Sequence, residues 1–187
     1  MIRPTWLILT VMVCCAWLMP MSMAAGGTTP QKGGSRGDQA LRGSVSESLP
    51  DKLTIRWSFK TGDEIKSSPV ISGNTLVTGS MDGYVYALDL NGHLLWKFNT
   101  ENGIEASALI VDQTVYIGNL SGTFYALNLS DGKQQWKYVT DGQISGAANW
   151  WKSGNTTRII VGSYDYNLHC IDAKTGKNIW KYESGNY

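Results

Sequence analysis

The chain has 187 residues, with 16 lysines and arginines against 15 aspartates and glutamates, and its formal net charge at pH 7 is +1. A chain this close to neutral, without a cluster of basic residues, lacks the electrostatic footprint of a nucleic-acid-binding protein. Two of its three cysteines are adjacent near the N-terminus, so no internal disulfide framework is expected and stability must come from packing.

Residues 1–24 have the features of a secretory signal peptide. Arg3 precedes an uncharged run over residues 4–19, which is shorter than the roughly 20 apolar residues that cross a bilayer. Small side chains at Ser22 and Ala24 predict cleavage after Ala24. The mature chain is therefore expected to be exported, to the periplasm or beyond the cell.

Lipid anchoring is the alternative to this cleavage, because Cys14 or Cys15 could carry a lipid after cleavage just before it. The residues over 11–13 are bulkier than a lipoprotein peptidase usually accepts, which favours cleavage after Ala24. Cys170 would then be the one cysteine of the mature chain, and we expect it to be a small buried apolar side chain. The mature chain shows no helical pattern, so no transmembrane helix is expected.

Residues 25–50 change to a composition of Gly, Ser, Thr, Gln and scattered charge, with almost no large apolar residue. Such a composition cannot bury enough surface to fold, so this segment is interpreted as a flexible linker. Residues 51–187 form the third region, in which tryptophans recur about every 40 residues, at Trp57, Trp96, Trp136 and Trp180. A period of that length is typical of repeat architectures, in which neighbouring units share a core.

One repeat unit contains four short apolar runs, which predict strands over residues 65–71, 74–79, 84–89 and 94–98. Gly, Asn and Asp lie between these runs, as is usual in hairpin turns. Each unit is therefore expected to be a four-stranded antiparallel meander. Two further units follow, and the extra residues of the last one fall at 151–155, at the tip of a polar hairpin.

The segment over residues 53–59 matches only the last strand of a unit. In closed propellers such an initial strand commonly completes the final blade and removes exposed edges. Three units are too few to close a ring, since propellers have about 4 to 8 blades. The chain is therefore expected to be part of a ring of seven or eight blades.

The turn sequences carry a family resemblance. The pattern Ala126-x-Asn128-x-x-Asp131-Gly132-Lys133-x-x-Trp136 and its copy around Trp180 are similar to the tryptophan-docking repeat of pyrroloquinoline-quinone-like (PQQ-like) β-propellers. The resemblance implies an all-β fold of radial blades, with each tryptophan packed between neighbouring blades near the rim. The positions that it singles out are the rings Trp57, Trp96, Trp136 and Trp180, the turn glycines Gly92, Gly132 and Gly176, and the turn acceptors Asp89, Asn128 and Asp172.

The family that this repeat resembles includes enzymes, the quinoprotein alcohol and glucose dehydrogenases. These enzymes hold the quinone and Ca²⁺ near the propeller axis beside a carboxylate base. That chemistry needs an oxygen cage and a positioned Asp or Glu, and the sequence shows neither. Some of these enzymes also stack the quinone on a disulfide of adjacent cysteines, yet the adjacent pair here lies in the expected leader. No cofactor or catalytic residue is therefore expected.

Five titratable residues are candidate site residues. Acids near the starts of first strands could face a central channel, but glutamates are mostly solvent-exposed. The histidines occupy unrelated repeat positions without neighbouring ligands, so no metal site is expected. The residues concerned are Glu64, Glu101, Glu105, His93 and His169.

The leading functional hypothesis is an exported, non-enzymatic scaffold of the cell envelope that binds other envelope proteins, since its repeats look similar to the propeller protein of the outer-membrane barrel-assembly machine. The alternative is the N-terminal part of a quinone- and calcium-dependent dehydrogenase whose catalytic residues lie beyond this sequence. A sensor or adhesin module is a third interpretation without a motif of its own. Trp150 and Trp151 are candidate interface residues. The alternative is a purely structural role, with one ring buried in the strand core and the other on the surface.

Overall fold

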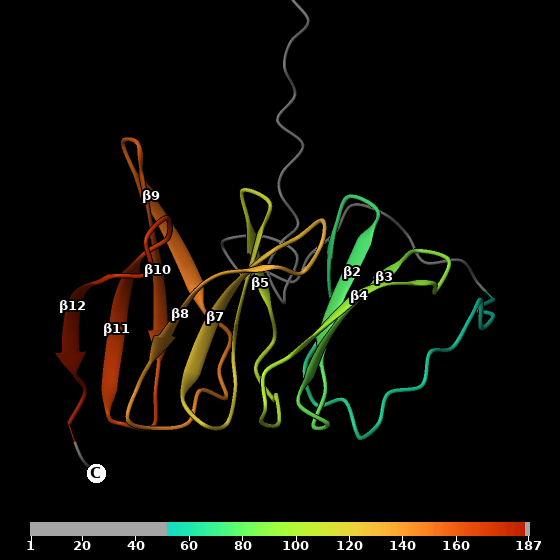
Figure 1. Ribbon diagram of the computed structural model, residues 1–187, viewed down its shortest axis with the longest axis horizontal. Coiled ribbons are helices and arrows are strands. Elements are labelled where there is room, and N and C mark those ends of the chain that lie inside the picture. Colours follow the sequence, from blue (N-terminus) through green and yellow to red (C-terminus); the bar gives the residue numbers. More distant parts are fainter. Residues whose placement is uncertain (1–51, 186–187) are drawn as a thin grey trace, which may run out of the picture.

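The computed structural model describes residues 52–185, and this part of the chain contains twelve strands and no helix. The expected signal peptide over residues 1–24 and the expected linker over residues 25–50 lie outside the described residues. The strands form three antiparallel sheets of four consecutive strands each (Figure 1). The prediction of an all-β chain built from four-stranded meanders is therefore confirmed.

The three sheets are named blades 1 to 3 in chain order. Blade 1 contains β1 (Val70–Ser72), β2 (Thr75–Gly79), β3 (Tyr84–Asp89) and β4 (Leu94–Asn99). Blade 2 contains β5 (Leu109–Val111), β6 (Thr114–Gly118), β7 (Thr123–Asn128) and β8 (Gln134–Val139). Blade 3 contains β9 (Asn149–Ser153), β10 (Thr156–Gly162), β11 (Asn167–Asp172) and β12 (Asn178–Glu183).

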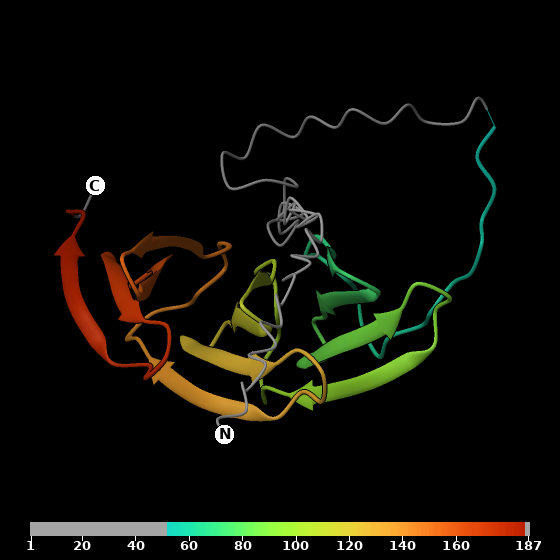
Figure 2. The same ribbon diagram turned by 90° about the horizontal axis from the view of Figure 1, so that it is seen from above.

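The blades lie side by side along an arc, as the view from above shows (Figure 2). The last strands β4, β8 and β12 lie on the convex outer side, and the first strands β1, β5 and β9 lie on the concave inner side. This radial order, with inner strands converging and outer strands at the rim, is the arrangement of successive blades in a β-propeller.

Each blade repeats one irregularity at the same place. The register between the third and fourth strands shifts after Ala87, Ala126 and Cys170. In each blade this residue is paired with the repeat tryptophan of the neighbouring strand, as in the pair of Ala87 and Trp96. A small side chain opposite the indole leaves room for the ring, which explains why alanine or cysteine precedes the turn in every unit.

The core lies between the blades and not within any one of them. Val77 and Val85 of blade 1 pack with Val115 and Leu127 of blade 2 in one buried cluster. Successive residues of a strand point to opposite faces, so Tyr116 and its neighbours on the other face of blade 2 form a second cluster with blade 3. A single blade therefore cannot bury both of its apolar faces.

Two strand predictions need correction. The first strand was expected over residues 65–71, but β1 covers only Val70–Ser72. Before it, the Ser67 hydroxyl takes the N–H of Gly79 at 2.9 Å, and the N–H of Ser68 donates to the Ser107 hydroxyl of the next unit. Side chains thus replace strand pairing there. Residues 53–59 also form no strand, since no neighbouring strand of the described chain pairs with them.

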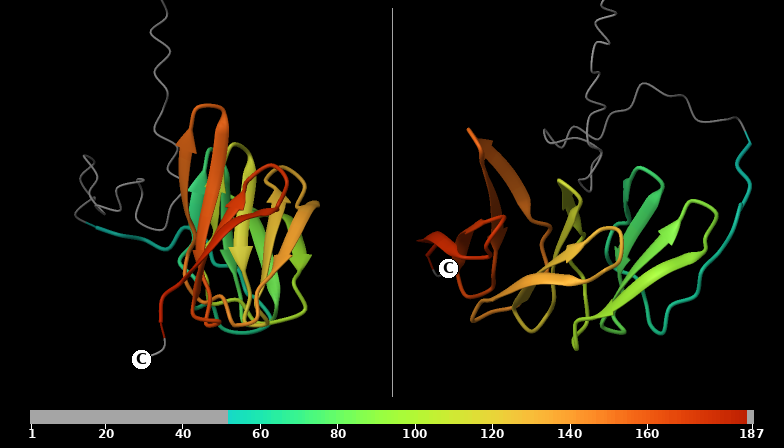
Figure 3. Two further views of the ribbon diagram at one scale, coloured as in Figure 1. Left: turned by 90° about the vertical axis from the view of Figure 1, so that its left-hand side faces the viewer. Right: turned by 45° about the horizontal axis from the view of Figure 1, so that its top comes forward.

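The extra residues of the third unit lengthen a hairpin, as predicted. Strand β9 has 5 residues and β10 has 7, whereas β5 and β6 have 3 and 5. The β9–β10 hairpin consequently rises above the corresponding turns of the other blades (Figures 1 and 3).

Candidate functional site

The repeat tryptophans connect each unit to the next. The indole Nε1 of Trp57 donates to the carbonyl of Leu90 at 3.0 Å, and that of Trp96 donates to Leu129 at 2.8 Å. Trp136 donates in the same way to Ala173 at 2.9 Å. Trp180 is 37% exposed, and its indole has no such acceptor within residues 52–185.

A glycine of the following turn lies against each of the first three rings. A Cβ on Gly92, Gly132 or Gly176 would lie 2.7 Å from Cδ2 of the ring of Trp57, Trp96 or Trp136 respectively. The three glycines have φ of 85°, 70° and 70°, in the left-handed region. These positions combine a close approach with a turn conformation, and both favour glycine.

The turn acceptors bond to the backbone that follows them. Oδ1 of Asp89 accepts the N–H of Asn91 at 2.8 Å, and Oδ1 of Asn128 accepts the N–H of Ser130 at 2.8 Å. Asp172 accepts the N–H of Thr175 at 2.9 Å. The hydroxyl of Thr175, foremost, lowers the pKa of Asp172. All three side chains stabilise turns.

The adjacent tryptophans Trp150 and Trp151 point to opposite faces of blade 3. The ring of Trp150 packs against the buried cluster between blades 2 and 3. Trp151 is 49% exposed, and the guanidinium of Arg158 lies 5.0 Å from its ring centroid. An exposed indole stacked with an arginine is an arrangement that protein interfaces often use.

A buried side-chain cluster joins blades 2 and 3. The ring of His169 is fully buried; its Nε2 donates to the carboxylate of Asp165 at 3.0 Å, and its Nδ1 lies 3.0 Å from the hydroxyl of Tyr138. The corresponding residues of the other blades are Tyr86, whose hydroxyl donates to Asp82 of its own β2–β3 turn, and Tyr125, whose hydroxyl donates to the carbonyl of Thr100 in the β4–β5 connection. The histidine keeps a bond to its own turn, at Asp165, and adds a second bond across the junction to Tyr138.

We expect Asp165→Asn to lower the free energy of unfolding by about 1–3 kcal/mol at pH 7, since a buried, charged hydrogen bond is lost. Burial would raise the pKa of Asp165, but hydrogen bonds from His169 and from the backbone lower it below its usual value. The native carboxylate therefore stabilises the fold above its unfolded pKa, and this contribution disappears as the pH falls through the lower folded pKa. Urea titrations between pH 7 and pH 2 measure the difference between variant and parent.

The matched control is Asp131→Asn, because Asp131 is 40% exposed and pairs with Lys133 on the surface. This change should alter stability by less than about 1 kcal/mol at any pH. An equal loss in both variants would show that the buried junction has no special role.

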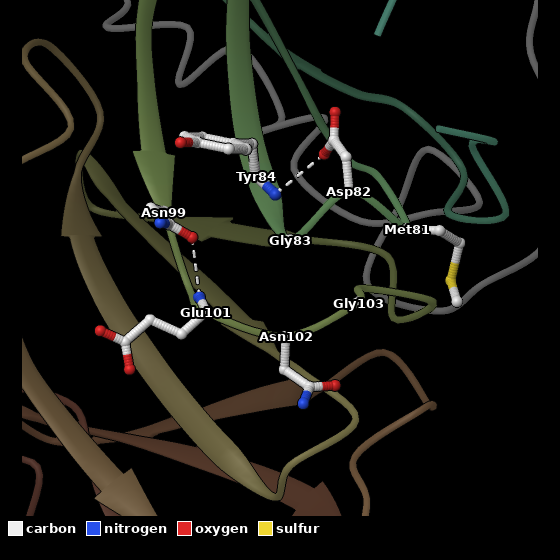
Figure 4. A pocket seen from close by; sticks show the side chains of 8 residues that line it. All are labelled: Met81, Asp82, Gly83, Tyr84, Asn99, Glu101, Asn102 and Gly103. Carbon is white, nitrogen blue, oxygen red and sulfur yellow. Dashed lines mark hydrogen bonds between the residues drawn. The ribbon is translucent and has the colours of Figure 1, made fainter. Parts of the chain in front are cut away.

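A cavity of about 460 Å³ lies beside the β2–β3 turn and the β4–β5 connection (Figure 4). Among the residues that line it, the carboxylates of Asp82 and Glu101 point away from each other. The Asp82 carboxylate is already bonded by the hydroxyl of Tyr86 at 2.6 Å and the N–H of Gly62 at 2.7 Å. Burial would raise the pKa of Asp82, and these bonds lower it. The side chains do not converge on a common ligand.

The candidate acids do not form a metal cage. Within residues 52–185, no three His, Cys, Asp or Glu side chains gather in a way that could hold an ion. Lys66 pairs with Glu64 and Glu105, each at 3.2 Å, and so joins the first two units on the surface. His93 bonds to Asp89 within its turn.

Sequence reasoning missed the cluster of Asp165, His169 and Tyr138. The one available signal was the alignment of His169 with Tyr86 and Tyr125, which marks a change in the third unit. It also missed the ion pair between Lys66 and Glu105, because residues 39 positions apart meet only when blades stack.

No helix long and apolar enough for a membrane span occurs in the part of the chain that the structure describes. No curated protein matches the sequence significantly. A family model described as outer membrane protein assembly factor BamB matches residues 51–154, which is more than half of the chain.

The solved structures similar to this chain include a BamB protein and quinohemoprotein alcohol dehydrogenases. BamB from Moraxella catarrhalis is 26% identical with a TM-score of 0.59, over 70% of this chain and 40% of that one. Quinohemoprotein alcohol dehydrogenase ADHIIG from Pseudomonas putida HK5 is 19% identical with a TM-score of 0.66, over 82% of this chain and 26% of that one. The quinohemoprotein alcohol dehydrogenase from Comamonas testosteroni is 19% identical with a TM-score of 0.65, over 85% and 28%.

The two dehydrogenases share the fold at this identity, and fold alone does not determine activity. The chain spans less than half the length of each of these structures. Because the family model covers more than half of the sequence, and the blades match a BamB structure, the chain belongs to the family of PQQ-like β-propellers described as outer membrane protein assembly factor BamB.

Proposed function

We propose that this protein is an exported, non-enzymatic scaffold of the cell envelope that takes part in the assembly of outer membrane proteins by binding other envelope proteins. The match of residues 51–154 to the assembly-factor family carries this proposal. Those residues include all of blades 1 and 2 and the start of blade 3, so the match covers the inter-blade contacts as well as single repeats.

The geometry supports a binding role because rigid blades present exposed turns. Backbone bonds join neighbouring units, as in the bond from the Leu120 N–H to the Gly103 carbonyl at 2.9 Å. Trp151 and Arg158 lie on the longest hairpin, with the indole half exposed. Tryptophan and arginine are the residue types that contribute most to protein interfaces, so this pair is the proposed anchor for a protein partner.

The alternative function, as the N-terminal part of a quinone- and calcium-dependent dehydrogenase, is supported by a likeness of fold at 19% identity. Dye-linked oxidation of an alcohol by the full-length protein, after addition of pyrroloquinoline quinone and Ca²⁺, would favour this alternative. Under the proposed function we expect neither saturable quinone binding nor dye reduction.

Deleting the gene in the host should lower the folded fraction of outer-membrane β-barrel proteins, measured by their heat-dependent mobility on gels. Expression of the full-length protein should restore that fraction. Trp151→Ala should restore it less well, since truncating an interface tryptophan commonly weakens binding by about 2 kcal/mol or more. Purified partner and scaffold should show the same loss by calorimetry.

The matched control is Tyr164→Ala. Tyr164 is also an exposed aromatic residue of blade 3, at 68%, but it lies in the β10–β11 turn at the other end of the blade. The Tyr164→Ala variant should restore the folded fraction of outer-membrane proteins as well as the parent protein does. Unchanged outer-membrane proteins after deletion would contradict the assembly role, and equal defects in both variants would contradict the proposed anchor.

A further inference from the structure

A cleft of about 350 Å³ opens between blades 2 and 3. It lies at the end of the blades that carries the β5–β6, β9–β10 and β11–β12 turns (Figure 1). Its wall includes Asp112 from the first of these turns, Asn155 from the second and Lys174 from the third. Three separate hairpins therefore surround one space.

The cleft depends on the insertion in the third unit. Asn155, Thr156 and Thr157 form one wall, and they belong to the lengthened β9–β10 hairpin. One bond within blade 3 and one bond across the junction hold the walls in place. The carbonyl of Thr157 accepts the N–H of Ala173 at 3.0 Å, and the carbonyl of Ala173 accepts the hydroxyl of Tyr116 at 3.3 Å. The cleft is thus formed without a ligand.

Several polar side chains around the cleft make no hydrogen bond to the described protein, although the charge of Lys174 acts on Asp172 and that of Asp112 on Tyr116. Within residues 52–185, the side chains of Asp112, Asn155, Thr157 and Lys174 make no hydrogen bond or ion pair with other groups. Thr114 is 7% exposed. Its hydroxyl oxygen accepts the amide of Gln135 at 3.2 Å, and the same hydroxyl is hydrogen-bonded to the side chain of Tyr116. Donors and acceptors therefore both face this space.

The floor of the cleft is aromatic. Tyr116 is 4% exposed and lines the cleft beneath the polar groups. Burial, foremost, and the carboxylates of Asp112 and Asp172 raise the pKa of its hydroxyl to about 12. Tyr116 consequently stays a neutral hydrogen-bond donor at all physiological pH values.

The charges around the cleft do not select a simple ion, because Asp112 and Asp172 oppose Lys174 within one space. A ligand that fits must both donate and accept hydrogen bonds at several points. Sugar hydroxyls do so, since each has one donor and two acceptor positions. The volume lies at the lower end of the range for small-molecule sites, about 300–1,000 Å³.

We propose that the cleft between blades 2 and 3 binds a short saccharide of one or two sugar rings. The carboxylate of Asp112 and the amide of Asn155 accept and donate bonds to ring hydroxyls, and Tyr116 lies beneath the ring. The cleft borders the β9–β10 hairpin that carries the proposed protein anchor, but neither Trp151 nor Arg158 lines it. A failure of sugar binding would therefore leave the proposed envelope role untouched.

The test is titration calorimetry of the full chain with glucose, maltose, N-acetylglucosamine and its β-1,4-linked disaccharide. We expect saturable one-to-one binding of at least one of the four. Asn155→Ala should weaken it about three- to tenfold, as the loss of one hydrogen bond does. The control is Asn74→Ala, which changes the same Ser-Gly-Asn-Thr turn of blade 1 and does not line the cleft. It should leave the affinity unchanged.

A second variant tests the cleft with a substitution that is expected to leave the fold intact. Asp112 has φ of 47°, a conformation that asparagine also tolerates, so Asp112→Asn should fold normally. The variant loses a charged acceptor and should weaken binding about tenfold or more. Absence of saturable binding at about 10 mM of every sugar would overturn the proposal. Equal weakening of binding by Asn155→Ala and Asn74→Ala would also overturn the proposal. Binding of tetralysine in place of any sugar would overturn it as well.

Discussion

Trp96→Ala is expected to lower the free energy of unfolding of the full chain by about 3–5 kcal/mol, the usual cost of removing a buried tryptophan ring. The Trp96 side chain is 8% exposed and packs in the cluster between blades 1 and 2. Its indole N–H donates to the carbonyl of Leu129 at 2.8 Å, and the variant leaves this carbonyl without a donor. Urea unfolding followed by far-ultraviolet circular dichroism measures the loss.

The control for this variant is Trp180→Ala, at the same repeat position in blade 3. Trp180 is 37% exposed, and its indole donates no hydrogen bond within the described chain. The loss there should be about 1 kcal/mol or less, since partial exposure reduces the burial term. Equal losses at both positions would contradict the conclusion that the tryptophan stabilises the fold through the following unit.

Gly122→Ala should lower the free energy of unfolding by about 2–5 kcal/mol, from backbone strain of about 1–2 and overpacking of about 1–3 kcal/mol. Gly122 has φ of 84°, in the left-handed region. A Cβ there would collide with the carbonyl oxygen of Gly142 and lie 2.8 Å from that of Thr140. Main-chain atoms cannot turn aside as a flexible side chain can. The melting temperature and the urea midpoint should both fall.

The matched control, Gly73→Ala, separates the two contributions. Gly73 has φ of 57°, but a Cβ there would meet no atom within 4 Å. This variant should lose only the backbone contribution, about 1–2 kcal/mol. If both alanines had the same effect, the close approach between the β6–β7 turn and the following connection would be unimportant.

Strand positions were predictable where apolar alternation and turn residues agree. The expected strand over residues 84–89 coincides with β3 (Tyr84–Asp89), and the expected run over 94–98 corresponds to β4 (Leu94–Asn99). The inserted residues also lie at a hairpin tip, where a longer turn disturbs no packed surface. Local sequence determines these features because strand, turn and side-chain direction depend on neighbouring residues.

The segment before β1 could not be assigned in this way. The expected strand began at Ile65, but residues 66–69 are Lys, Ser, Ser and Pro, and the Ser67 hydroxyl accepts the Gly79 N–H in place of strand pairing. Residues 53–59 have the sequence of a last strand, but no described strand pairs with them. A strand needs a partner as well as a pattern, and the partner is not encoded locally.

The candidate sites were the least predictable part. His169 meets Tyr138 from another blade, and the proposed saccharide cleft combines Asp112, Asn155 and Lys174 from three hairpins. The groups that meet in each site come from different strands or hairpins. Their meeting depends on the angle and separation of two packed blades, which the packing of the interior sets.

By itself, the sequence determined the repeat, the strand order within a unit, the turn chemistry and the family resemblance, because each arises from residues within a single period of the chain. Tertiary structure alone decided which blade faces meet, which side chains are buried between them and where polar groups remain unpaired. The physical reason is that a blade has two apolar faces and cannot cover either by itself. Contacts between blades, and every site built from them, therefore exist only after the units have packed.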